Sequence, residues 1–205
     1  MKKLKIYMFS ILMGIIPVLA TMSIVFLQRS ASDGTQRFSE IWILGPERTA
    51  SNYPFNLTVN NSYSCQFFVG VKNNLGYDID YLLLVKLSNQ TDMLPSHLDS
   101  LASPLQSVYK FEFSLSNEGI WETYVNLTVP ESAFFSIERN VMNLTGILIN
   151  GESISGFSLM LTRTIETRGY PFLVFFELWA YDVALQDFSY HNRFASLWLN
   201  LQPEL

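Results

Sequence analysis

The sequence has little charge, a single cysteine and only two histidines. Charged residues make up 15% of its 205 residues, well below the roughly 25% of ordinary soluble domains. Cys65 has no partner for an intrachain disulfide, so a stable fold must depend on its apolar core. With only His97 and His191, and with no Gly-x-Ser-x-Gly motif, catalytic-triad chemistry is disfavoured. The sequence therefore predicts no enzyme.

Positive charge is also scarce beyond the N-terminus. From residue 28 onward there are ten basic and eighteen acidic side chains, a net charge of −8, and no Lys/Arg cluster for nucleic acid. No Gly-rich phosphate loop follows a predicted strand, and we predict no cofactor and no metal. Asp78 and Asp80 are spaced to share a calcium ion, but calcium needs about six oxygens or more. We interpret the pair as an exposed acidic strand edge.

One long hydrophobic run stands near the N-terminus. Residues 6–27 contain no charged side chain, and as a helix they would extend about 33 Å, enough for a bilayer core of about 30 Å. Residues 1–5 carry three lysines and are predicted to be cytoplasmic, which places the rest of this single-pass protein outside the cell. The polar residues 28–37 are predicted to be a flexible tether.

A cleaved signal peptide is the alternative to this anchor. Val18-Leu19-Ala20 has the spacing of a signal-peptidase site, but the apolar run continues through Leu27, beyond the roughly 7–15 residues usual for such a region. The length favours an uncleaved anchor, and both alternatives export the remainder.

Alternation with a period of two dominates the exported part. In residues 63–71 every second side chain is apolar, and similar runs recur between turn-rich segments. Asn150-Gly151 between two apolar runs is a strong hairpin signal, and only short helical turns are expected, within 93–102 and 130–142. The pattern predicts an all-β, antiparallel, immunoglobulin-like sandwich of about ten strands formed by residues 38–205. Two subdomains divided near residue 129 remain an alternative.

Acceptor sequences for N-glycosylation support an extracellular location. Glycans need solvent, and the alternation places Asn126 opposite the apolar face that contains Val125 and Leu127. The five predicted glycosylation sites are Asn56, Asn60, Asn89, Asn126 and Asn143.

Several segments together resemble one known family. The motifs are Leu44-Gly45-Pro46, Tyr53-Pro54, Val71-Lys72-Asn73 and Asp80-Tyr81, together with the closing segment 175–200. They are similar to the archaeal "domain of unknown function 1616" membrane proteins, although some members of that family have several membrane helices. The resemblance implies an archaeal surface protein with an immunoglobulin-like sandwich, and it implies no reaction, cofactor or catalytic residue.

A non-catalytic structural or interaction module is the predicted function. Such a module would dock an envelope or membrane protein, for example an S-layer subunit, through a sheet face or edge. Trp42, Trp179 and Trp198 are the predicted half-exposed anchors. The alternative is a carbohydrate-binding domain that uses exposed aromatic rings.

Two polar groups near the C-terminus are further candidates for weak partner contacts. Glu177 shares a strand face with Trp179, which suits a sugar-binding face and equally suits a buried carboxylate paired with arginine. His191 and Arg193 could clamp an anionic or sugar ligand. Alternatively, Asn192 and Arg193 secure a turn before the last strand, with Arg193 bonded to Glu177.

Overall fold

The computed structural model shows an all-β protein whose residues from Phe38 onward form one compact unit. The described residues include no helix long and apolar enough to cross a membrane. The predicted anchor, the cytoplasmic tail and nearly all of the tether lie outside them, as do Asn60 and His97. The structure describes residues 37–57, 63–96, 99–138 and 140–202.

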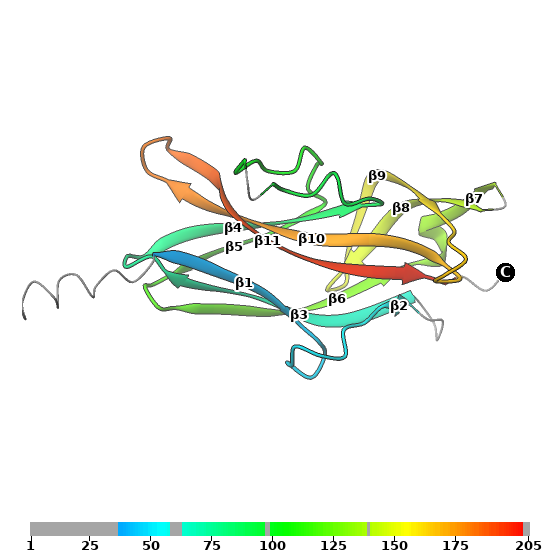
Figure 1. The fold of residues 1–205 in the computed structure, drawn as a ribbon, viewed down its shortest axis with the longest axis horizontal. Coiled ribbons are helices and arrows are strands. Elements are labelled where there is room, and N and C mark those ends of the chain that lie inside the picture. The colour runs from blue at the N-terminus through cyan, green and yellow to red at the C-terminus, as the bar shows by residue number, and fades with distance from the viewer. Residues whose placement is uncertain (1–36, 58–62, 97–98, 139, 203–205) are drawn as a thin grey trace, which may run out of the picture. The chain divides into compact units, whose positions relative to one another are not determined.

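The strands form two sheets (Figure 1). One has the order β1-β3-β6-β8-β7, with β9 also paired to β8, and the other has the order β2-β11-β10-β4-β5. All pairings are antiparallel except that of β2 with β11. The strands are β1 Phe38–Leu44, β2 Asn56–Leu57, β3 Tyr63–Asn74, β4 Ile79–Ser88, β5 Tyr109–Leu115, β6 Ile120–Val129, β7 Phe134–Glu138, β8 Val141–Ile149, β9 Glu152–Thr162, β10 Tyr170–Asp182 and β11 Asp187–Leu201.

The core lies between the two sheets and is built from the alternating positions. On β3 the side chains of Tyr63, Cys65 and Phe67 are buried while those between them face outward. Phe67 meets Phe176 of β10 edge to face across the layers, with ring centroids 5.9 Å apart. The prediction of an all-β protein with two packed sheets is confirmed.

The C-terminal strands belong to both sheets, with β8 and β9 in one and β10 and β11 in the other. Between β8 and β9, Asn150 and Gly151 have φ values of 53° and 85°. Two successive positive φ angles are what a type I′ hairpin turn requires, so this predicted hairpin is confirmed.

A short 3-10 turn, Glu131–Ala133, lies within residues 130–142, where a short helical turn was expected, and residues 134–138 then form strand β7. One local prediction was wrong. The segment around Asn192 is not a turn, because β11 already begins at Asp187. The register passes from Leu178–Arg193 to Trp179–Tyr190, and Asn192 has a φ of 54°. This bulge interrupts the alternation, so the pattern did not reveal the first half of the strand.

The long connection between β4 and β5 covers part of the outer face of the second sheet, as Figure 1 shows. We call residues 89–96 and 99–108 the covering loop. On β10, Leu173 and Phe175 point away from the core between the sheets and are nevertheless buried. The second sheet is thus apolar on both faces over part of its length.

Candidate functional site

Glu177 lies under the covering loop and forms a buried ion pair. Its carboxylate is 2.8 Å from Nζ of Lys86, and the side chains are 0% and 4% exposed. It also accepts hydrogen bonds from the backbone N–H of Ser103 at 2.7 Å and from Nε1 of Trp179 at 3.1 Å. Lys86 donates to the carbonyl of Ser103 at 2.9 Å. Glu177 is therefore paired with Lys86 rather than Arg193, and this arrangement fastens the covering loop to the sheet.

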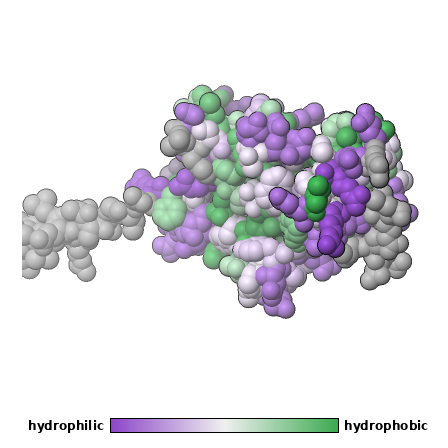
Figure 2. All heavy atoms as spheres, turned by 45° about the vertical axis from the view of Figure 1, so that its right-hand side comes forward, coloured by the Kyte–Doolittle hydropathy of each residue, from purple (hydrophilic) through white to green (hydrophobic). Residues whose placement is uncertain are grey.

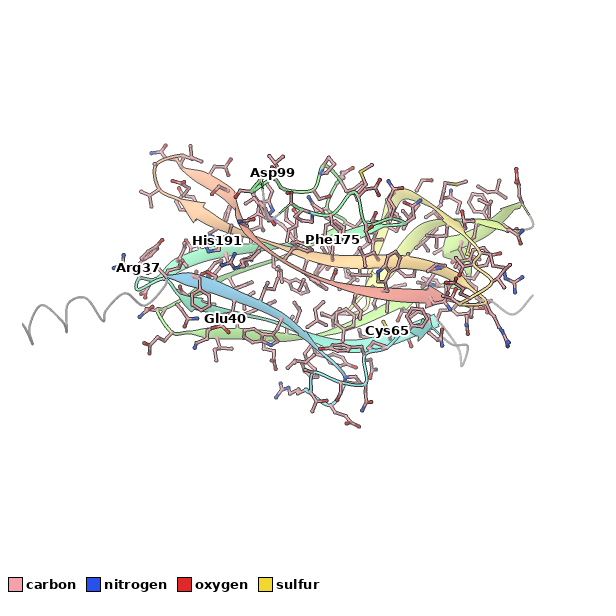
Figure 3. The ribbon with its side chains drawn as sticks, viewed as in Figure 1. Arg37, Glu40, Cys65, Asp99, Phe175 and His191 are labelled. Atoms are coloured by element: carbon pink, nitrogen blue, oxygen red, sulfur yellow. The ribbon has the colours of Figure 1, made fainter. Side chains whose placement is uncertain are left out.

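His191 and Arg193 contribute to a group of hydrogen bonds that connects the two sheets, at the end where β1 begins (Figure 3). Oγ of Ser39 is 2.6 Å from the hydroxyl of Tyr81 and 2.9 Å from Nε2 of His191. Nε of Arg193 donates to the carbonyl of Ser39 at 3.1 Å. Burial, with a smaller effect of Arg193, lowers the pKa of His191. Because Ser39 is fully buried, this Ser–His pair is closed to substrates.

Trp42 lies on the outer face of the first sheet in a cluster of its own. Its ring lies so close to Gly70 that a Cβ there would be 2.3 Å from a ring atom. Its Nε1 donates to Glu122 at 3.2 Å, and Nε of Arg48 lies 3.2 Å from the same carboxylate. The guanidinium of Arg48 also covers the ring of Phe68, 4.6 Å from its centroid. Contacts within the protein thus already engage much of the Trp42 side chain, which was predicted to be an anchor for a partner.

The other two tryptophans lie on the second sheet, at a distance from each other. Trp198 pairs with Leu173 and Trp179 pairs with Tyr190. The six positions from Leu173 to Trp179 along β10 correspond to about 20 Å. Trp198 is exposed, whereas Trp179 is partly buried. The structure therefore separates the predicted anchors, with Trp42 on the first sheet and Trp179 and Trp198 far apart along the second.

The predicted glycosylation sites differ in exposure. Asn56 and Asn89 are exposed, and Asn126 is partly buried on the face opposite the core. Asn143 is buried, and its side-chain oxygen accepts a hydrogen bond from a serine of β9. Attachment of glycans at these positions stays a prediction.

An open groove with acidic and aromatic walls lies at one end of the second sheet. It consists of two adjoining hollows of about 440 and 410 Å³ that share Asp80, Ser114 and Tyr181. We call it the acidic groove and define it by Tyr77, Asp78, Asp80, Glu112, Ser114 and Tyr181.

The carboxylates of the groove are held by neutral donors. Asp80 accepts a hydrogen bond from the hydroxyl of Ser114, its partner across β4 and β5. Asp78 accepts one from the backbone N–H of Asn117 at 3.0 Å. Glu112 is 3.5 Å from Lys110, but within the described part of the chain no cation lies within 4 Å of Asp78 or Asp80. The groove thus carries two uncompensated negative charges.

Exposed aromatic rings flank these charges. Tyr77 is 53% exposed and Tyr181 is 37% exposed. The Tyr181 ring is fixed by an edge contact with Phe188 of β11, at 5.6 Å between centroids. Ring faces attract cations by about 0.5–1 kcal/mol at exposed sites. The groove therefore suits a cationic group, and its rings also suit a sugar.

Sequence reasoning identified Asp78 and Asp80 but not the groove. The other walls come from β5, β10 and β11, which only the strand pairing brings beside β4. Glu112 and Ser114 alternate with apolar residues in the sequence and so share a face of one strand, but alternation does not identify the neighbouring strand. Among the described residues, no three His, Cys, Asp or Glu side chains are grouped closely enough to hold a metal ion.

No protein-family model and no curated protein matches the chain. Among solved structures, it is similar to a β-glucosidase from Listeria innocua (13% identity, 61% of this chain and 16% of that chain, TM-score 0.30). It is also similar to an ASH/PapD-like domain of human CEP192 (7% identity, 79% and 83%, TM-score 0.29). A glucohydrolase from Trichoderma reesei is comparable (8% identity, 80% and 19%, TM-score 0.29). The chain spans about a sixth of the Listeria enzyme's length.

Proposed function

We propose that the chain is a membrane-anchored, non-catalytic module on the outer face of the cell. Residues 6–27 span the bilayer, and the sandwich, which we take to be immunoglobulin-like, docks an envelope protein. The acidic groove receives a lysine or arginine side chain of that partner. The observation that carries the proposal is the pair Asp78 and Asp80, uncompensated by any cation among the described residues and set beside exposed rings.

Rigid walls favour such a contact. Asp80, Glu112 and Ser114 belong to paired strands, and hydrogen bonds already orient the carboxylates of Asp78 and Asp80. A preformed site loses little conformational entropy when its partner binds. Opposite charge also steers the two proteins together and weakens with added salt.

Affinity capture and crosslinking of the intact protein from native membranes test this function. We expect reproducible partners with the wild type that are lost with D78N/D80N, whose side chains keep their shape without their charge. The matched control, D92N/E131Q, removes two exposed carboxylates elsewhere and should retain the partners. Recovery of the same partners with D78N/D80N would contradict the proposal.

Carbohydrate binding is the second candidate, and the exposed rings of Tyr77 and Tyr181 favour it. Aromatic rings stack on pyranose rings, and the adjacent carboxylates can accept hydrogen bonds from sugar hydroxyls. A glycan array probed with the full chain in detergent separates the two functions. Sugar binding that is lost in Y181A but kept in D78N/D80N would support carbohydrate recognition, whereas a silent array would leave protein docking.

A further inference from the structure

A basic loop lies at the opposite end of the sandwich from the start of β1. Residues 163–169 connect β9 to β10. Figure 2 turns this end of the sandwich toward the viewer and shows a small hydrophobic area surrounded by hydrophilic atoms. The Ile165 side chain is 96% exposed. Arg163 and Arg168 flank it and line a hollow of about 430 Å³. No described carboxylate lies within 4 Å of either guanidinium.

This basic loop is held in place by its neighbours. The N–H of Arg163 donates to the carbonyl of Asn140 at 2.8 Å, which ties the loop to the β7–β8 hairpin. The carbonyl of Thr167 accepts from the side-chain amides of Asn200 at 3.0 Å and Gln202 at 2.8 Å, which ties it to the end of β11. The loop therefore presents its two arginines and its isoleucine from a fixed backbone.

The basic loop and the acidic groove are complementary. The loop offers two cations around one apolar side chain, and Glu166 is its only acidic residue. The groove offers Asp78 and Asp80 beside aromatic rings, and the 80% exposed Val183 lies on its rim. The two surfaces thus carry opposite charge, and each has exposed apolar or aromatic side chains that can pack against those of the other.

We propose that the occupant of the acidic groove is the basic loop of a second copy of this chain. The inference rests on the proposed function and names the partner of that same site. Ile165 packs against Tyr181 and Val183, while the arginines face the groove carboxylates. The two surfaces lie at opposite ends of the sandwich, so the contact is head-to-tail. Each contact leaves one groove and one loop free, which extends into a row of copies.

The proposal is tested with two charge-reversed variants, each of which should lose self-association that mixing the two restores. In R163E/R168E both ends of the molecule are acidic, and in D78K/D80K both ends are basic, so neither variant should self-associate. A mixture of the two has complementary surfaces and should assemble again. The full chain is reconstituted in vesicles, because confinement to a bilayer raises its effective concentration, and assembly is followed by energy transfer between labelled copies.

We expect each variant alone to weaken assembly at least about tenfold, because like charges face each other, and the mixture to restore it. The control R37E/K72E reverses two cations outside the loop and should assemble like the wild type. Wild-type protein that stays monomeric, or a mixture that fails to assemble, would overturn the inference.

Crosslinking reveals the geometry of the contact. Cysteines introduced as I165C and V183C in one chain should give a ladder of dimers, trimers and longer species under oxidation, while the buried Cys65 remains unreactive. Dimers alone would refute a head-to-tail row. A different result would contradict the proposed docking function. That result is capture of every wild-type partner by D78N/D80N, whether or not the chain self-associates.

Discussion

Replacing Lys86 by methionine should destabilise the protein far more than a surface substitution does. Methionine is similar in length and apolar, so it fills the site but leaves the carboxylate of Glu177 buried without its cation. Removing one partner of a buried ion pair costs about 3–5 kcal/mol. We expect the lower end of that range, because Ser103 and Trp179 still donate hydrogen bonds to the carboxylate.

Urea unfolding of the full chain in mild detergent, followed by tryptophan fluorescence, measures this loss. The double variant K86M/E177Q removes both charges and keeps an oxygen that can accept the hydrogen bond from the Ser103 N–H, so it should regain most of the lost stability, because no buried charge remains unpaired. Hydrogen exchange at the Ser103 amide, which the carboxylate binds, reports separately whether the covering loop detaches.

Two results would refute this reasoning. A single variant K86M within about 1 kcal/mol of the wild type would mean that water reaches the Lys86–Glu177 pair in solution. A double variant as unstable as the single one would mean that the lost packing of Lys86, and not the charge of Glu177, sets the cost.

Three further predictions follow from the packing. G70A should lose about 1–3 kcal/mol in urea unfolding, because its Cβ would clash with the Trp42 ring; unchanged stability and tryptophan emission would contradict that packing. Burial and Arg193 lower the pKa of His191 below its ordinary 6.5, so the unfolded chain binds the proton first and the free energy of unfolding should fall as pH drops below about 6.5. H191Q should flatten this slope, and an equal slope in both proteins would be the contrary result. Burial raises the pKa of Cys65 to about 12, so a thiol reagent should label it only after urea unfolding; rapid labelling of the native chain would show that it is accessible.

The sequence by itself determined the class of the fold. Successive side chains of a strand point to opposite faces, so apolar residues at every second position indicate a strand with one buried face. Runs such as 63–71 therefore specified both the strand and the face that it buries. The hairpin at Asn150-Gly151 was equally readable, because its two positive φ angles are a local requirement. The bulge at Asn192 was not, because it breaks the period that identifies a strand.

Tertiary structure alone decided what surrounds each polar side chain. Alternation indicates which residues share a face of one strand, but it contains nothing about which strand lies beside it. Glu177 was therefore assigned to Arg193, whereas pairing of β10 with β4 and closure of the covering loop bring it to Lys86. The acidic groove arises in the same way, because Asp80, Glu112 and Tyr181 come from three strands that meet only in the folded sheet.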